Sequence, residues 1–130
     1  MENICKILKE AKTIAIVGLS SNPNKTSRQI ADFLILKGYS VVGVNPATDT
    51  AGNIICYKNL SEIPFPVDII DIFRPSKDIP FLTDEIISIK PKLVWLQLGI
   101  KNNSEIEKMK NAGIDSVQNK CIKIEYQRCF

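Results

Sequence analysis

The chain alternates between short apolar runs and longer stretches in which apolar residues recur every three or four positions. The short runs are nearly continuous and rich in β-branched residues, which is typical of strands buried on both faces of a parallel sheet. They span residues 13–17, 40–44, 67–73, 93–98 and 114–117. The longer periodicity predicts amphipathic helices, and these cover residues 3–11, 27–37, 79–89 and 104–112.

This alternation predicts an α/β fold in which right-handed crossovers wind a five-stranded parallel sheet in both directions. The simplest strand order is 3-2-1-4-5, with helices on both faces. The direction of winding then reverses between the first and fourth strands, so a ligand crevice is expected outside their carboxyl ends. The segments that would meet there are 18–27, 45–48, 73–76 and 97–103.

Capping residues predict where two of the helices begin or end. Thr26 or Ser27 is expected to cap the second helix, which Gly38 should end. The spacing of Ser104 and Glu107 is that of a capping box for the fourth helix.

Two stretches give weaker signals. Residues 47–66 are expected to be irregular, with one short extended piece over 54–57. The tail over 121–126 alternates as a strand does, but it also suits one or two helical turns. We therefore leave the tail open between the two.

Composition is that of an ordinary globular protein and predicts one domain over residues 1–130, with 45% hydrophobic and 24% charged residues. The net charge of +3 comes without any basic cluster, so nucleic acid is not an expected partner. No apolar run approaches the ~18 residues that span a bilayer. Residues 1–6 do not resemble a signal peptide. We therefore expect a cytoplasmic protein without a membrane partner.

The cysteines are Cys5, Cys56, Cys121 and Cys129, and their spacing matches no metal site. We expect four free thiols, mostly buried. Cys121 lies between two lysines, so the alternative for it is a reactive thiol that forms a mixed disulfide with a thiol-bearing ligand. The chain contains no histidine, which excludes a Ser-His-Asp or Cys-His pair, a His-ligated metal and a phosphohistidine of its own.

One loop is the strongest candidate for ligand binding. The first strand ends at Gly18, and a small polar loop leads into the second helix. At such a junction backbone N–H groups face a bound anion, and a glycine lets a phosphate approach closely. Side-chain donors would assist, so the candidate residues are Gly18, Leu19, Ser20, Ser21, Asn22, Lys25 and Ser27.

The ends of the other strands supply further candidates. Arg74 has a planar guanidinium that suits a phosphate, and its neighbours Phe73 and Pro75 could cover a base or an aliphatic arm. Near the end of the fourth strand, Gln97 either contacts the ligand or bonds a neighbouring loop, and Gly99 follows it.

Two features count against NAD as the ligand. The loop has one glycine where a dinucleotide fingerprint has three. Asn45 ends the second strand, where a nicotinamide dinucleotide site needs Asp or Glu for the ribose hydroxyls. Asn45, Pro46 and Ala47 form either a shelf for an adenine or simply a turn.

Three residues inside strands are not expected to act at the site. Asp68 and Asp71 are three positions apart, so they face opposite sides of a strand and cannot work as a carboxylate pair. Trp95 is expected in the core.

Five motifs occur in order from about Thr13 to Tyr126, namely Ile16–Ser20, Val44–Pro46, Asp68–Pro75, Val94–Ile100 and Cys121–Glu125. Together they resemble those of the small single-domain CoA-binding proteins. This family shares its Rossmann-like fold with the CoA-binding domain of the succinyl-CoA synthetase α subunit. There are three departures from the usual pattern: Lys25 replaces an Arg, Asn119-Lys120 replaces an Asp-Arg pair, and Tyr126 replaces a His.

The resemblance implies a Rossmann-like fold that binds coenzyme A or an acyl-CoA. Its diphosphate would lie on the 18–27 loop near Lys25, and its adenine toward residues 45–47. Residues 73–75 would flank the nucleotide or the pantetheine, and residues 97–99 would close the other wall.

We expect a binding protein without catalytic residues or a metal. One alternative is an NAD(P)-type nucleotide-binding or redox-sensing module, and another is an accessory subunit of an acyl-CoA ligase. The ligase relatives work through a phosphohistidine on another domain, which this chain lacks. A purely structural module is the remaining alternative, and protein partners are not identified.

Overall fold

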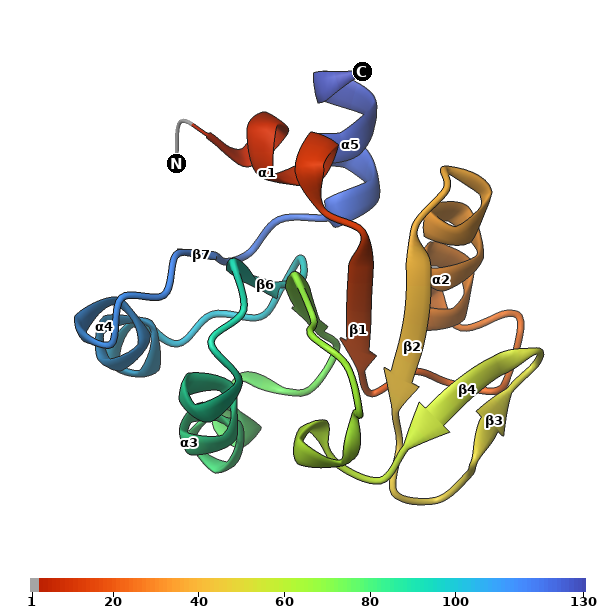
Figure 1. Cartoon of the computed structure of the whole chain (residues 1–130), viewed down its shortest axis with the longest axis horizontal. Coiled ribbons are helices and arrows are strands. Elements are labelled where there is room, and N and C mark those ends of the chain that lie inside the picture. Colours follow the sequence, from red (N-terminus) through yellow and green to blue (C-terminus); the bar gives the residue numbers. More distant parts are fainter. Residues whose placement is uncertain (1–2) are drawn as a thin grey trace.

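The computed structural model describes residues 3–130. Met1 and Glu2, the start of the stretch compared with signal peptides, lie outside the described residues. The helices are α1 (Ile4–Glu10), α2 (Thr26–Leu36), α3 (Pro80–Ile89), α4 (Asn103–Asn111) and α5 (Ile122–Cys129), with 3-10 turns η1 (Leu60–Glu62) and η2 (Ser76–Asp78). The strands are β1 (Thr13–Val17), β2 (Ser40–Val44), β3 (Thr50–Ala51), β4 (Ile54–Tyr57), β5 (Ile69–Ile72), β6 (Leu93–Leu96) and β7 (Ser116–Val117). The α/β class and the alternation of elements are confirmed (Figure 1).

The predicted number and order of strands were wrong. The described residues form a seven-stranded sheet of order β3-β4-β2-β1-β5-β6-β7. The short extended piece over 54–57 is β4, which pairs in parallel with β2, and β3 adds an antiparallel edge. Because β4 occupies the place beside β2, β5 pairs with β1 instead. The winding therefore reverses between β1 and β5 and not, as predicted, between β1 and β6, so the crevice is expected outside the carboxyl ends of β1 and β5.

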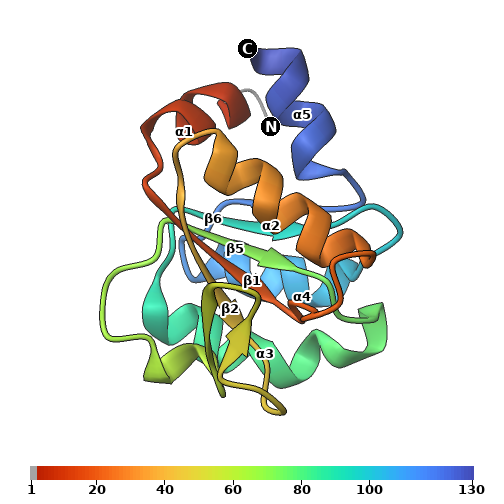
Figure 2. The same ribbon diagram turned by 90° about the vertical axis from the view of Figure 1, so that its right-hand side faces the viewer.

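Helices cover both faces of the sheet, as expected. Figure 2 shows α1, α2 and α5 on one side and α3 on the other. The first group closes a core around Ile16, Leu34 and Trp95. On the opposite face, α3 and α4 close a second core around Val17, Ile70 and Met109. Strands buried on both faces explain why their sequences are almost continuously apolar.

Two predicted caps were wrong. Lys25 is the N-cap of α2 and makes no side-chain cap, because a lysine side chain has no acceptor. The Ser27 hydroxyl accepts a hydrogen bond from Ser20 N instead of capping the helix. At α4 the cap is Asn102, whose side chain accepts from Glu105 N, so the expected pair Ser104 and Glu107 forms no capping box. Gly38 ends α2 with a positive φ of 101° as predicted.

The tail is a helix, α5, and it lies beside α1 (Figures 1 and 2). This packing brings Cys5 and Cys129 together, and they form a disulfide with Cα atoms 5.4 Å apart. The expectation of four free thiols was therefore wrong for this pair, while Cys56 and Cys121 are free. The partners are 124 positions apart, so only the folded packing of α1 on α5 brings them together.

Asp68 and Asp71 have opposite environments. Asp68 lies at the start of β5 and accepts hydrogen bonds from Lys12 N (2.8 Å) and Thr13 N (3.1 Å). Asp71 is fully buried within β5, and neither of its oxygens has a hydrogen-bond partner among the described residues. Burial raises the pKa of the Asp71 carboxyl well above its usual value.

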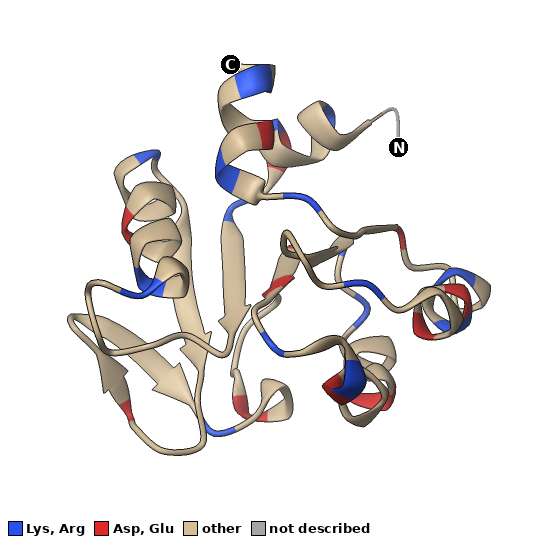
Figure 3. Cartoon of the chain, turned by 180° about the vertical axis from the view of Figure 1, so that it is seen from behind, with Lys and Arg blue, Asp and Glu red and all other residues tan. Residues whose placement is uncertain are grey.

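Within residues 3–130, no helix combines the length and apolar character required to cross a bilayer. Helix α4 carries both acidic and basic residues, and Figure 3 shows the red and blue segments close together on it. The absence of a membrane or nucleic-acid partner, like the cytoplasmic location, stays a prediction.

Candidate functional site

Three strand ends meet at Gly18. The backbone N–H of Gly18 donates to Val44 O at the end of β2 (3.0 Å), and Phe73 N donates to Val17 O at the end of β1 (2.9 Å). Gly18 turns the chain out of β1 with a φ of 87°, which L side chains rarely adopt. The segments after β1, β2 and β5 are thus held side by side at the point where the winding reverses.

The loop from Gly18 to Ser27 uses its polar side chains mainly to fix its own shape. Ser27 accepts from Ser20 N, Ser20 Oγ accepts from Asn22 N, and Asn22 Oδ1 accepts from Asn24 N. No side chain caps α2, and while Arg28 N and Gln29 N donate to Lys25 O, the N–H groups of Thr26 and Ser27 remain available to an external acceptor. The rigid loop therefore presents a helix N-terminus suited to an anion.

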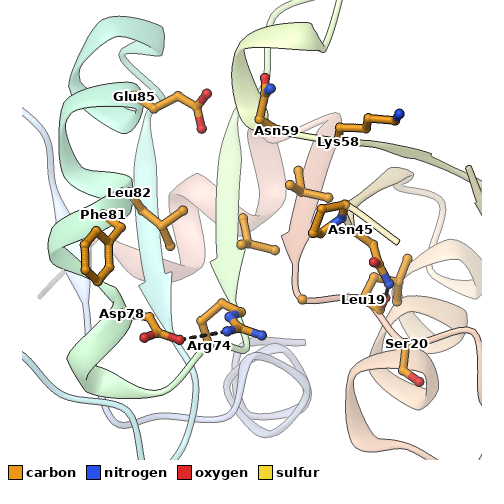
Figure 4. Close-up of a pocket in the computed structure, with 14 residues that line it drawn as sticks. Leu19, Ser20, Asn45, Lys58, Asn59, Arg74, Asp78, Phe81, Leu82 and Glu85 are labelled. Atoms are coloured by element: carbon orange, nitrogen blue, oxygen red, sulfur yellow. Dashed lines mark hydrogen bonds and ion pairs between the residues drawn. The ribbon is translucent and has the colours of Figure 1, made fainter. Parts of the chain in front are cut away.

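A cavity of about 600 Å³ opens beside this loop. Its size is that of a small-molecule site. Figure 4 shows one wall built from the ends of β1, β2 and β4, with α3 forming the facing wall. Its lining residues are Val17, Gly18, Leu19, Ser20, Val44, Asn45, Pro46, Lys58, Asn59, Arg74, Asp78, Phe81, Leu82 and Glu85.

Arg74 reaches the floor of the cavity from the end of β5 (Figure 4). Its aliphatic stem lies against Gly18, so a Cβ built on that glycine would be 3.2 Å from Arg74 Cδ. Its guanidinium pairs with Asp78 Oδ2 at 2.7 Å. The Arg74 side chain remains half exposed, which leaves donors of its planar fork available to a ligand.

Asn45 joins two of the loops that frame the cavity. Its amide Nδ2 donates to Leu19 O (3.0 Å), and its Oδ1 accepts from Ala47 N (2.8 Å). Both ends of the side chain are therefore used in holding the loop after β1 to the loop after β2.

The structure brings together only part of the predicted site. Gly18, Leu19, Ser20, Asn45, Pro46 and Arg74 line the cavity. Several candidates lie near it in sequence but outside its lining, namely Ser21, Asn22, Lys25, Ser27, Ala47, Phe73 and Pro75.

Gln97 and Gly99 belong to a different network. Gln97 is buried, and its Oε1 accepts from Ile122 N at the start of α5 (3.0 Å). Gly99 N donates to Asn119 Oδ1 (2.8 Å). Of the two roles considered for Gln97, the structure shows the bond to a neighbouring segment. These contacts fasten α5 to the carboxyl end of β6.

Trp95 and Cys121 lie in the same region. Trp95 is fully buried, as expected, and its indole N–H donates to Lys120 O (2.8 Å). Cys121 is the N-cap of α5, packs against the core formed by α1, α2 and α5, and is half-buried. It does not line the cavity. The mixed-disulfide hypothesis for Cys121 remains untested.

Sequence reasoning missed the second half of the cavity wall. Lys58 and Asn59 follow β4, while Phe81, Leu82 and Glu85 lie on α3 and Asp78 lies just before it. The Glu85 carboxylate accepts from Leu60 N and Ser61 N (3.2 and 3.1 Å) and from the Ser61 hydroxyl. It therefore holds η1 against α3. The apolar piece over 54–57 could have revealed part of this wall. If it is counted as a strand of the sheet, Lys58 follows the strand and lies at the crevice.

The arrangement supports binding of an anion that also has an apolar or planar part. Exposed backbone N–H groups and two cations offer recognition of negative charge, while Val17, Val44 and Leu82 supply apolar surface. No group of three or more Cys, Asp or Glu placed to hold a metal ion occurs among residues 3–130.

Fold and site together define a Rossmann-like α/β protein with a ligand cavity at the reversal point of its sheet. Residues 12–127 match the sequence model of the CoA binding domain family. The chain belongs to this family, as its motifs predicted.

Two relatives are similar over nearly their whole length. The uncharacterized protein YneT of Bacillus subtilis (strain 168) is 32% identical over 123 residues, covering 95% of this chain and 91% of YneT. The solved structure of cell-free ID.343 from Thermus thermophilus is 32% identical, with a TM-score of 0.95, and the match covers 99% of this chain and 98% of that one.

A more distant likeness concerns the fold alone. The dinucleotide forming acetyl-coenzyme A synthetase 1 of Ca. Korarchaeum cryptofilum, solved with phosphate and ADP, is 23% identical with a TM-score of 0.78. The match covers 90% of this chain and 28% of the synthetase. The same Rossmann-like unit thus forms one part of a much larger enzyme.

Proposed function

We propose that this protein binds coenzyme A or an acyl-CoA in the cavity beside Gly18 and does not itself catalyse a reaction. The observation that carries the proposal is the Arg74 side chain against a close-approach glycine, Gly18, in the cavity wall. The uncapped N-terminus of α2 is tied to the same wall by the hydrogen bond from Ser20 N to Ser27 Oγ. Membership of the CoA binding domain family supports this ligand.

Each part of CoA has a matching surface. The diphosphate would lie on the loop from Gly18 to Ser27, where N–H groups and Arg74 stabilise negative charge. The adenosine would occupy the cavity between Pro46 and Leu82. The pantetheine arm would leave toward the end of β6, where Gln97 and Gly99 lie.

The alternative nucleotide, NAD, has less support from the same site. A ribose with free hydroxyls is bound in Rossmann sites by a carboxylate after the second strand. Asn45 stands there instead, and its amide is engaged with Leu19 and Ala47. The other alternative, an accessory subunit of an acyl-CoA ligase, would use this same CoA site and require a partner for catalysis.

A thermal-shift panel tests the ligand class directly. The purified chain is heated with CoA, acetyl-CoA, NAD, NADP, FAD or ATP. A ligand present at about 100 times its Kd adds roughly 2.7 kcal/mol to the free energy of unfolding. We expect CoA or acetyl-CoA to raise the melting temperature most. A larger shift with NAD, NADP, FAD or ATP, or no shift with either CoA or acetyl-CoA, would contradict the proposal.

A further inference from the structure

Lys58 lies in the cavity wall, and its ammonium group forms no ion pair with a carboxylate of the described residues. The two cationic side chains of the lining are Arg74 and Lys58. Arg74 is paired with Asp78, and the Glu85 carboxylate is engaged with the backbone of η1. Lys58 makes no ion pair within residues 3–130. Its ammonium group is therefore available to an anionic ligand.

The backbone at Lys58 is fixed beside the end of β2. Asn45 N donates to Tyr57 O (2.9 Å), which joins the residue before Lys58 to the residue after β2. Lys58 N donates to Glu62 Oε2 (3.2 Å). Lys58 and Asn45 thus leave adjacent parallel strands at the same edge of the sheet, as Figure 4 shows.

This edge is where Rossmann-type sites discriminate between riboses. A carboxylate after the second strand binds a free ribose diol, whereas a cation nearby accommodates a phosphate on the ribose. Here the first group is missing, since Asn45 has no charge and its amide holds two loops together. The cation that accommodates a ribose phosphate is present, since Lys58 supplies it. The chemistry of this wall therefore favours a phosphorylated ribose.

We propose that Lys58 binds the phosphate carried by the ribose of the ligand, which in CoA is the 3′-phosphate. The assignment rests on the proposed function and adds a specificity residue to it. Lys58 then determines that this cavity prefers CoA to the same molecule without that phosphate, because the ammonium gains a charge-assisted contact only with the phosphorylated ligand.

Calorimetric titration with CoA and with dephospho-CoA tests this assignment. We expect the wild type to bind CoA on the order of tenfold more tightly, the magnitude of one charge-assisted hydrogen bond. Lys58→Ala should lose this preference and keep the wild-type affinity for dephospho-CoA, while Lys58→Arg should retain it. The control is Lys77→Ala, since Lys77 is exposed in η2 near the cavity but outside its lining, and this variant should keep the preference.

Four results would overturn the assignment. The wild type could bind the two ligands equally, or Lys58→Ala could lose the same affinity for both. Either result would show that Lys58 does not recognise the ribose phosphate, without contradicting the proposed CoA site. A loss of preference in Lys77→Ala as large as in Lys58→Ala would attribute the effect to general charge. Binding of neither ligand by the wild type would overturn the proposed function together with this inference.

Discussion

The Arg74 side chain lies across Gly18, so that a Cβ at this glycine would come within 3.2 Å of Arg74 Cδ and 3.1 Å of Phe73 O. Gly18→Ala should therefore displace Arg74 and obstruct the phosphate site. A residue other than glycine at its φ of 87° also costs about 1–2 kcal/mol. We expect a lower melting temperature together with weaker binding of CoA, measured by calorimetry.

Gly113 offers a matched control for this substitution. Its φ is 83°, but a Cβ built there meets no atom within 4 Å. Gly113→Ala should cost similar stability and leave the affinity for CoA unchanged. Equal affinity for CoA in the two variants would contradict the role given to Gly18.

The disulfide between Cys5 and Cys129 should stabilise the fold substantially. It closes a loop with a sequence separation of 124, and a loop of this size corresponds to roughly 4–5 kcal/mol when the unfolded chain is constrained. We expect a reductant to lower the melting temperature. Cys5→Ser should match the reduced wild type and should not respond to the reductant.

Cys121→Ser is the control for the disulfide, because Cys121 is a free thiol. This variant should keep the full response to the reductant. A titration of thiols in denaturant without reductant should find two per chain. Four titratable thiols in the untreated protein would contradict the pairing.

Asp71 should make the protein less stable as the pH rises. Its pKa is raised in the folded state by burial, so the folded protein binds its proton more tightly than the unfolded chain does. The stability that this carboxyl provides is present below its unfolded pKa of about 3.9 and is lost as the pH rises through the folded pKa. Asp71→Asn removes the ionisable group and should be more stable than the wild type at pH 7 in urea unfolding, because the asparagine neither buries a charge nor takes up a proton on folding.

Asp68→Asn should show the opposite sign. Partial burial raises the pKa of Asp68, but hydrogen bonds from Lys12 N and Thr13 N and the Lys92 ammonium outweigh it, so the net pKa is lowered. The stability it provides is present above its unfolded pKa and is lost as the pH falls through the folded pKa. Asp68→Asn should therefore destabilise the protein at pH 7. An equal effect of the two substitutions at pH 7 would contradict the two environments.

Sequence patterns predicted the helices and strands of this fold better than they predicted which strands lie side by side. The apolar runs and the helical periodicity predicted the long elements apart from α5, which was left open between strand and helix. Strand order depends on pairing between distant segments, and β4 lies within residues 47–66, which were expected to be irregular, so its short extended piece was not counted as a strand of the sheet. That single omission moved β5 to the wrong side of β1.

The sequence could place at the cavity those candidate residues that follow a strand end, but not the lining residues that two distant segments bring together. Gly18 and Arg74 follow strands directly, and strand ends can be read from the sequence. Lys58 lies at the cavity because β4 pairs with β2, and Phe81 lies on α3, which Glu85 joins to η1. Similarly, Ser27 and Gln97 use their polar atoms on partners that no local pattern reveals.

The most direct measurement is a calorimetric titration of CoA into the wild type, Arg74→Ala and Arg128→Ala. Both arginines are exposed and pair with a carboxylate on the same segment, Arg74 with Asp78 and Arg128 with Glu125, but only Arg74 lines the cavity. We predict one CoA bound per chain, an affinity about tenfold or more lower in Arg74→Ala, and no change in Arg128→Ala. An absence of CoA binding by the wild type, or an unchanged affinity in Arg74→Ala, would contradict the account.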